Sequence, residues 1–244
     1  MPKYQLTYKP YGERAILIEW PSIISEAILY DILAFKKAIL KDKQEEGVEL
    51  NSAYRSLIVI FKDTSIDFKK QIHYFKNIYT SLKKEHRQHY KLWKIPVCYH
   101  PDFGIDLECL SQEKKISIES IIEAHTKGLY TVYFIGFLPG FLYLGGLDEL
   151  LWIPRKGTPR LTIEKGSVGI GGNQTGIYPK ESPGGWNIIG NAPIDFFNIQ
   201  NDIPCFASPG DKIQCIPISK KEHQDVKILV EAGVYQIESE VIHD

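Results

Sequence analysis

The sequence pattern changes near residue 90, and this change limits what the chain can fold into. In the first part, residues 14–20 and 56–61 are apolar enough to be strands of a sheet. Two amphipathic helices are expected beside them, one with Ser22 as its N-cap and one opened by Asp67. The buried face of the first helix is expected to consist of Ile24, Ile28, Ile32, Phe35 and Ile39. Residues 1–90 are therefore predicted to be a small α/β domain, one sheet covered by two helices.

Beyond residue 90 the chain is interrupted repeatedly by glycine and proline. A helix is expected over residues 116–128, with Ser117 as N-cap and Gly128 as its stop. The other apolar runs are short and β-like, and they include ILVEAGVYQIES at 228–239. Many short strands with turns between them favour a β-barrel or a β-sandwich. The expected fold class is α+β, with the small α/β domain followed by a mainly-β domain over residues 91–244.

Composition argues against nucleic acid or a membrane as the main partner. The 244 residues carry a formal net charge of −1, with 43% hydrophobic and 24% charged residues, as in an ordinary soluble protein. The most apolar stretch, residues 134–147, is shorter than the ~20 residues of a membrane-spanning helix, and Pro and Gly interrupt it. The N-terminus has no signal-peptide pattern, and the scattered cysteines form no C-x-x-C pair. A cytoplasmic protein with free thiols is expected.

Four stretches between residues 136 and 186 concentrate glycine, proline, aromatic residues and arginine. They are GFLPGFLYLGG (136–146), PRKGTPR (154–160), GSVGIGGNQTGIYP (166–179) and SPGGW (182–186). Each one alone is also explained by glycines at the bends of a barrel and aromatic residues in a core. Together they favour a small-molecule cleft, which combines aromatic walls, flexible backbone and a few polar groups. The arginines of the second stretch favour a carboxylate or phosphate ligand, with surface salt bridges as the alternative.

His125 lies near the end of the predicted helix. The helix dipole favours a protonated imidazole there, which is a sufficient structural reason for it, and an acid–base or ligand-binding role is the alternative. The loop with His100, Asp102 and Asp106 contains no established metal-binding pattern, so no metal site is assigned. Phosphate-loop, dinucleotide and serine-hydrolase motifs are absent from the sequence. The residues alone indicate a two-domain protein with a C-terminal cleft for an anionic ligand.

The four stretches, in this order, resemble the family that includes the B subunit of 5-oxoprolinase, the sporulation kinase inhibitor KipI and subunit 1 of allophanate hydrolase. YGERAILIEW at 11–20 and SPGD at 208–211 match as well, so the resemblance covers most of the chain. It implies a small α/β N-terminal domain and a C-terminal cyclophilin-like β-barrel. It also implies two partner proteins, a C subunit of the KipA type and an A subunit. With these partners, such chains convert 5-oxoproline to glutamate using ATP.

This resemblance suggests roles for individual residues. A lactam amide is a poor electrophile, so ATP, bound by the assembled complex, would activate its carbonyl, and the charge that develops needs preorganised donors. Arg155 and Arg160 would bind the substrate carboxylate or phosphate, His125 would orient a polar group, and Gly184 and Gly185 would present backbone amides to an oxyanion. The residues expected to bind substrate are Phe137, Pro139, Gly140, Gln174, Tyr178, Gly184, Gly185 and Trp186.

Other functions stay open on the sequence. A KipI-like regulator would dock on a sensor histidine kinase and inhibit it, which requires a protein-binding surface but no arginine-lined cleft. A subunit of an allophanate- or urea-type amide hydrolase or carboxylase would use the same cleft for another substrate. Prolyl isomerase activity is suggested only by the expected barrel and is the weakest alternative, because a fold does not fix a function.

Overall fold

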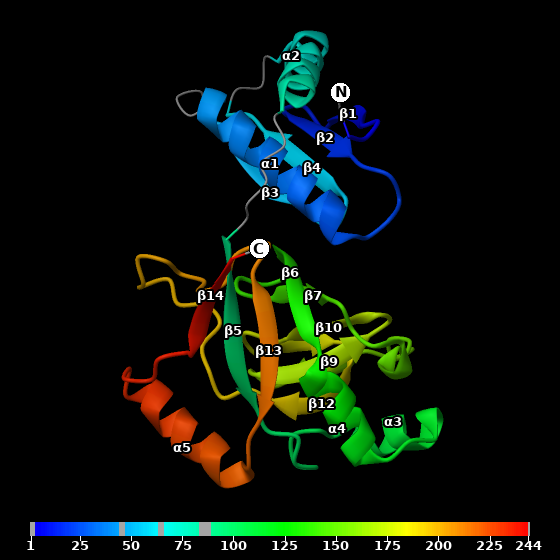
Figure 1. Cartoon of the computed structure of the whole chain (residues 1–244), viewed down its shortest axis with the longest axis vertical. Helices are drawn as coiled ribbons and strands as arrows, with labels where there is room; N and C mark the ends of the chain where they lie inside the picture. The colour runs from blue at the N-terminus through cyan, green and yellow to red at the C-terminus, as the bar shows by residue number, and fades with distance from the viewer. Residues whose placement is uncertain (1–2, 44–46, 63–65, 83–88, 244) are drawn as a thin grey trace. The chain divides into compact units, whose positions relative to one another are not determined.

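The computed structural model describes residues 3–43, 47–62, 66–82 and 89–243. The chain divides into two compact units, residues 1–88 and 89–244, each with its own hydrophobic core (Figure 1). Among the helices of the described ranges, none has the length and apolar character needed to span a membrane.

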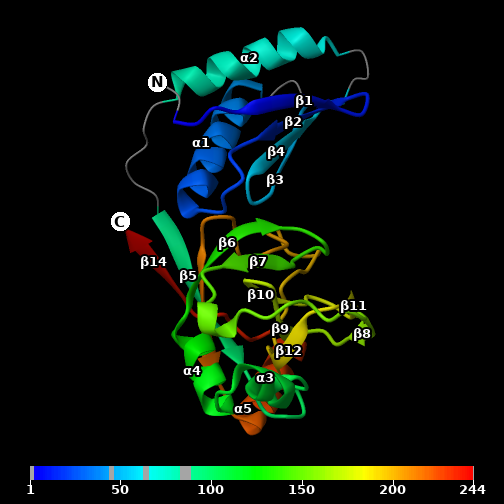
Figure 2. The ribbon, with the colours of Figure 1, turned by 90° about the vertical axis from the view of Figure 1, so that its right-hand side faces the viewer.

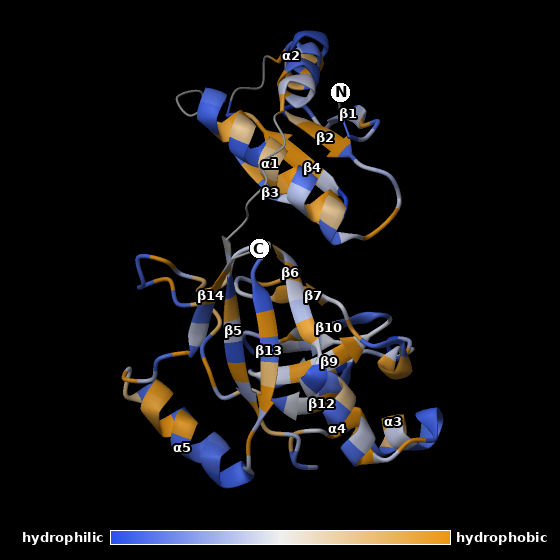
Figure 3. Ribbon diagram, in the orientation of Figure 1, coloured by the Kyte–Doolittle hydropathy of each residue, from blue (hydrophilic) through white to orange (hydrophobic). Residues whose placement is uncertain are grey.

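The first unit is a four-stranded antiparallel sheet with two helices. Its strands are β1 (Thr7–Tyr11), β2 (Ala15–Glu19), β3 (Glu49–Ser52) and β4 (Ser56–Ile60), paired in the order β1-β2-β4-β3. The helices are α1 (Glu26–Lys43) and α2 (Phe68–Ser81). Strands β2 and β4 are hydrophobic along their length (Figure 3). Alternate residues of both strands are fully buried and pack against the apolar faces of α1 and α2.

The helical period correctly predicts most of the buried face of α1. Ile28, Ile32, Phe35 and Ile39 are buried as expected. The expected start of the helix is wrong, because the helix begins at Glu26 and the hydroxyl of Ser25, not Ser22, accepts a hydrogen bond from the Ile28 amide at 3.3 Å. Ile24 therefore precedes the helix and is 46% exposed. Asp67 caps α2 as predicted.

The second unit is built on a larger, curled sheet. Its eight strands follow the order β12-β9-β10-β7-β6-β13-β5-β14, and all neighbours are antiparallel except β5 and β13. The strands are β5 (His89–Val97), β6 (Leu129–Ile135), β7 (Leu142–Gly145), β9 (Ser167–Gly171), β10 (Gln174–Ile177), β12 (Asn187–Asn191), β13 (Lys212–Pro217) and β14 (Ser239–His243). A separate two-stranded sheet joins β8 (Arg160–Ile163) to β11 (Ser182–Gly184).

The helices of this unit are α3 (Leu107–Lys114), α4 (Ile118–Lys127) and α5 (Lys220–Glu231), with a 3-10 turn η1 at Glu149–Leu151. The predicted helix over residues 116–128 is confirmed as α4, capped by Ser117. The β-like interpretation of 228–239 is wrong, because residues 228–231 are the end of α5 and the next strand, β14, begins only at Ser239. A capping box between Ser219 and Glu222 starts that helix.

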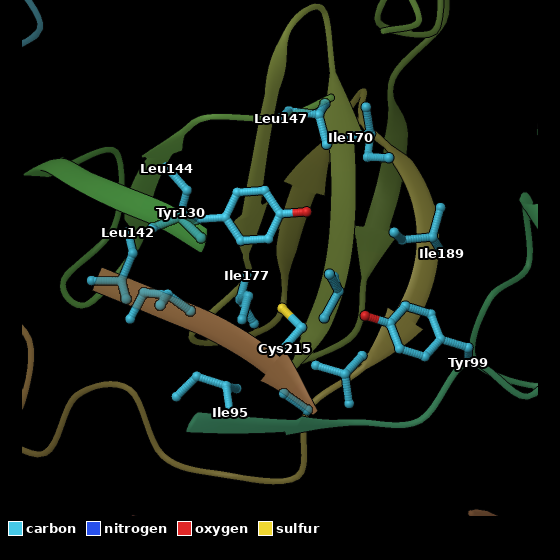
Figure 4. Close-up of a cluster of buried hydrophobic side chains, with 14 of the residues drawn as sticks. Ile95, Tyr99, Tyr130, Leu142, Leu144, Leu147, Ile170, Ile177, Ile189 and Cys215 are labelled. Atoms are coloured by element: carbon cyan, nitrogen blue, oxygen red, sulfur yellow. The ribbon is translucent and has the colours of Figure 1, made fainter. Parts of the chain in front are cut away.

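Figure 2 shows β6, β7, β10, β9 and β12 one below the other, in the order in which they pair, and the segment after β5 contacts β12. Cys98, just after β5, exchanges two backbone hydrogen bonds of 2.9 and 3.0 Å with Asn191 of β12. Figure 4 shows Tyr99, Tyr130 and Cys215 pointing into the enclosed space among isoleucine and leucine side chains. Because this interior is packed, side chains that can meet a ligand lie on the outer face and in the loops. The α+β fold class is confirmed, while the cyclophilin-like barrel stays a prediction.

Candidate functional site

The centre of the candidate site is Trp186, whose indole packs against three glycines of β9 and β10, which we call the glycine floor. A Cβ atom at Gly171 would lie 2.7 Å from both Cδ1 and Nε1 of the indole, and one at Gly176 would lie 3.0 Å from Cζ3. Gly169 is similarly close, at 3.1 Å from the Trp186 Cβ. The glycines of β9 and β10 are therefore needed because a large ring crosses both strands.

Aromatic side chains surround this indole. Phe141, Tyr143 and Tyr178 meet Trp186 edge-on, with ring centroids 5.5, 6.4 and 6.5 Å from it. Trp186 is only 5% exposed and Tyr178 only 2% exposed. The expectation that both rings form open walls is therefore wrong, because they are packed into the base of the site.

Arg155 lies over the Trp186 ring. Its Cζ atom is 5.5 Å from the ring centroid, in cation–π geometry, and the residue is exposed. Burial raises the pKa of both Tyr143 and Tyr178, and the nearby charge of Arg155 opposes that shift in both. Within the part of the chain that the structure describes, Arg155 makes no ion pair with a carboxylate. The arginine therefore presents a positive charge beside the aromatic base of the site.

Three further predicted residues lie in the loop that leads to Phe141 of this aromatic group. Phe137 is 62% exposed and has a φ of +65°, a backbone conformation that is uncommon for a bulky side chain. Its ring lies 5.6 Å from that of Phe141, edge to face. Gly140, at φ +83°, must be glycine, because a Cβ there would lie 2.7 Å from the Cβ of Phe197. Pro139 is exposed in the same loop.

Arg160 belongs to a different set of contacts, centred on Asp106. Its guanidinium donates to both carboxylate oxygens of Asp106, at 2.9 and 2.6 Å. Lys156 lies 2.9 Å from the same carboxylate, and the Ile188 amide donates to it at 2.7 Å. Burial by itself would raise the pKa of Asp106, but these hydrogen bonds outweigh it and hold the pKa below its usual value. Arg160 also lines a pocket of about 190 Å³.

The prediction that the Gly184 and Gly185 amides face an oxyanion stays a prediction, while packing gives this segment a structural reason. A Cβ at Gly184 would lie 2.3 Å from the Tyr178 hydroxyl, so packing within the protein requires this glycine. The Gly185 carbonyl accepts a hydrogen bond from the Lys156 amide at 2.7 Å. Neither glycine has a positive φ. We therefore assign the Pro-Gly-Gly-Trp segment to the packing around Trp186 and Tyr178.

His125 lies in the packed core of the second unit. It is 0% exposed and both of its ring nitrogens are paired within the protein, so a role in catalysis is not supported. The Thr175 hydroxyl donates to the Gly169 carbonyl at 3.1 Å, so it accepts from His125 Nε2 at 2.9 Å. His125 Nδ1 then accepts from the Tyr99 hydroxyl at 2.7 Å. This fully paired, neutral imidazole connects α4 to β10.

The burial of His125 makes stability depend on pH. Burial lowers its pKa to about 3, from an ordinary value of 6.5. The unfolded chain therefore takes up a proton below pH 6.5 that the folded chain does not, and stability falls as the pH decreases from 6.5 towards 3. The contribution is about 1.4 kcal/mol per pH unit within this window. Burial also lowers the pKa of His223, which acts in the same direction.

Urea unfolding of His125→Gln at pH 7, 6 and 5 tests this expectation. The variant is expected to be less stable at pH 7 but to lose less stability than the wild type on acidification. His100→Gln, which changes an exposed histidine, serves as the control. The same pH dependence in wild type and His125→Gln would contradict the prediction.

The loop considered for a metal is occupied by ion pairs. Asp106 faces Arg160 and Lys156, and Asp102 pairs with Lys220. No group of three or more His, Cys, Asp or Glu suited to a metal ion occurs among the described residues. The pairing of Asp106 with Arg160 could not be read from the sequence, since 54 positions separate the two residues. The sequence also gives no signal for a role of Lys156, which lies between the two arginines of PRKGTPR.

Comparison with known proteins identifies the family. The family described as carboxyltransferase domain, subdomain C and D, matches residues 6–207. The B subunit of Bacillus subtilis 5-oxoprolinase is 33% identical over 236 residues, which cover 92% of this chain and 97% of the relative. This chain belongs to the family of 5-oxoprolinase B subunits. The B subunit of the Haemophilus influenzae enzyme is 37% identical over 207 residues, which cover 85% and 95% of the two chains.

The fold of this family extends to larger enzymes. The structure of Kluyveromyces lactis urea amidolyase superimposes with a TM-score of 0.85 over 99% of this chain and 16% of that protein. At 19% identity this likeness shows the fold alone. It shows that this fold also occurs within urea amidolyase. The sequence comparisons confirm the family resemblance of the four stretches.

Proposed function

We propose that this chain is the B subunit of a cytoplasmic, ATP-dependent 5-oxoprolinase, which opens 5-oxoproline to L-glutamate in a complex with other subunits. The similarity to the B subunit of the B. subtilis enzyme carries the proposal, because it runs along 92% of this chain and 97% of the relative. Such a subunit requires partner chains, and we expect two of them, an A subunit together with a C subunit of the KipA type.

The chemistry places specific demands on such a complex. The lactam carbonyl oxygen would take the γ-phosphoryl group of ATP, with ADP leaving. Water would then add to the activated carbon, and the C–N bond would break as the ring nitrogen gains a proton, which leaves an acyl phosphate of glutamate. A second water molecule would cleave this acyl phosphate and release phosphate and glutamate. The assembled complex would hold ATP. The exposed Arg155 and the aromatic group around Trp186 support a place for the small, anionic lactam on this chain.

Reconstitution tests this proposal. The chain is combined with its candidate A and C partners, and 5-oxoproline-dependent ATP hydrolysis and glutamate release are measured. We expect glutamate to form with all three chains and to disappear when this chain is omitted. An assembled complex without turnover would instead favour another amide or carboxylation substrate. Failure of any complex to assemble would favour the kinase-binding regulator.

A further inference from the structure

We propose that Arg155 binds the carboxylate of the substrate and that Gln174 accepts a hydrogen bond from the lactam N–H. In the same scheme, Asp106 holds Arg160 and Lys156 in place as positioning residues that do not themselves contact the substrate. The identity of the ligand rests on the proposed function, whereas the division of roles rests on the contacts of these side chains.

The two arginines differ in whether a nearby carboxylate compensates their charge. Asp106 is 3% exposed and binds both Arg160 and Lys156, so its carboxylate compensates their charge. Arg155 lies over the Trp186 ring and has no carboxylate partner in the described ranges. A guanidinium over an aromatic ring still has N–H donors for a further partner. Those donors match the two oxygens of a carboxylate.

Gln174 supplies an unused acceptor beside the indole. It lies opposite Gly171 in the β9–β10 pair, so the two side-chain positions share one face of the sheet. Trp186 covers the Gly171 position on that face, which places Gln174 next to the ring. The Gln174 Oε1 atom is buried, and no group among the described residues donates a hydrogen bond to it. Such an atom is costly to bury, and a ligand N–H would satisfy it.

The exposed aromatic residue of the site suits the rest of the ligand. Phe137 stands at the surface in a strained conformation beside Phe141, and strained residues of this kind cluster at ligand sites. The methylene groups of a lactam ring can pack against such a ring. In the ligand, a negative group would therefore meet Arg155, an N–H donor would meet Gln174, and an apolar edge would meet Phe137. This combination is present in 5-oxoproline.

Binding to the full chain tests the inference. The indole Nε1 signals are followed by NMR during titration with 5-oxoproline and with 5-oxoprolinamide, which lacks the negative charge. Trp186→Phe identifies the Trp186 signal. We expect the Trp186 signal to shift and the acid to bind about 30-fold more tightly than the amide, since a hydrogen bond to a charged group contributes that order of affinity.

Substitutions then assign the contacts. Arg155→Gln should weaken the acid alone and bring the two affinities within about threefold of each other, and Arg155→Lys should restore part of the difference. Gln174→Ala should weaken both ligands by about fivefold, as expected for a neutral hydrogen bond. Lys180→Gln, which removes an exposed cation of the same unit, should change neither affinity.

Several outcomes would overturn the inference. These are an Arg155→Gln variant that weakens acid and amide equally, loss of acid selectivity in Arg160→Gln alone, and no shift of Trp186 with either ligand. Glutamate formation by the reconstituted complex is measured separately. Turnover that is indifferent to Arg155→Gln would overturn the assignment but keep the proposed function. Charge-selective binding at Arg155 without turnover in an assembled complex would support the assignment and reject the function.

Discussion

Asp106→Asn is expected to lower the free energy of unfolding by about 3 kcal/mol, at the lower end of the range for breaking a buried ion pair. The substitution removes the charge that compensates both Arg160 and Lys156. These cations are partly exposed, at 30% and 25% of their side chains, so water recovers some of the loss. The contacts of Asp106 also connect the residue preceding α3 to β8 and β12, so the order of these segments should decrease.

Urea unfolding followed by tryptophan fluorescence measures this effect. Asp102→Asn is the matched control, because Asp102 lies in the same loop and its exposed carboxylate pairs with Lys220. No measurable change is expected from that substitution. If Asp106→Asn were as stable as the control, the contacts centred on Asp106 would not be a structural unit, and their positioning role would have no basis.

Gly171→Ala is expected to lower the free energy of unfolding by about 2 kcal/mol, as overpacking of a filled core does. The added methyl group would lie within 2.8 Å of three atoms of the Trp186 indole. The glycines of this floor belong to the paired strands β9 and β10 and cannot move without breaking that pairing. The indole of Trp186 must therefore shift. Because Arg155 lies over the indole, the position of Arg155 should change as the indole shifts.

Near-ultraviolet circular dichroism and urea unfolding test this substitution together. The spectrum should change with the environment of Trp186. Gly157→Ala is the matched control, because a Cβ there meets nothing within 4 Å and its φ is not positive. Its stability should stay within about 0.5 kcal/mol of wild type. Equal stability of the two alanine variants would show that the indole does not depend on the glycine floor.

The sequence predicts the parts of the fold in which a local pattern decides the outcome. The 3.6-residue spacing of Ile28, Ile32 and Phe35 identifies the buried face of α1, and Ser117 marks the start of α4. The sequence wrongly predicts a strand at the end of α5, because the apolar residues of the helix continue directly into a Gly-Val-Tyr segment in which polar and apolar residues alternate as in a strand. The Ser219–Glu222 capping box, present in the sequence, was the signal that identifies this helix.

The site was harder to predict because its contacts join distant segments. The crowding of glycine, aromatic residues and arginine favours a cleft over residues 136–186, which stays a prediction. The structure brings Phe141, Tyr178 and Trp186 together but places Arg160 with Asp106. Only the structure separates Arg155 from Arg160, since the partner of Arg160 lies in another loop. The place of His125 at the helix end predicts a protonated imidazole, and the family resemblance suggests a polar role, whereas tertiary packing buries the ring completely and lowers its pKa.

The most direct test of the account is the KM for 5-oxoproline of the assembled complex that contains either the wild-type chain or Arg155→Gln. Losing a charged contact to the substrate carboxylate, which lies away from the reacting carbonyl, should raise KM by about 30-fold. The same reasoning predicts little change in kcat and no loss of complex assembly. An unchanged KM for Arg155→Gln in a complex that still forms glutamate would contradict the account.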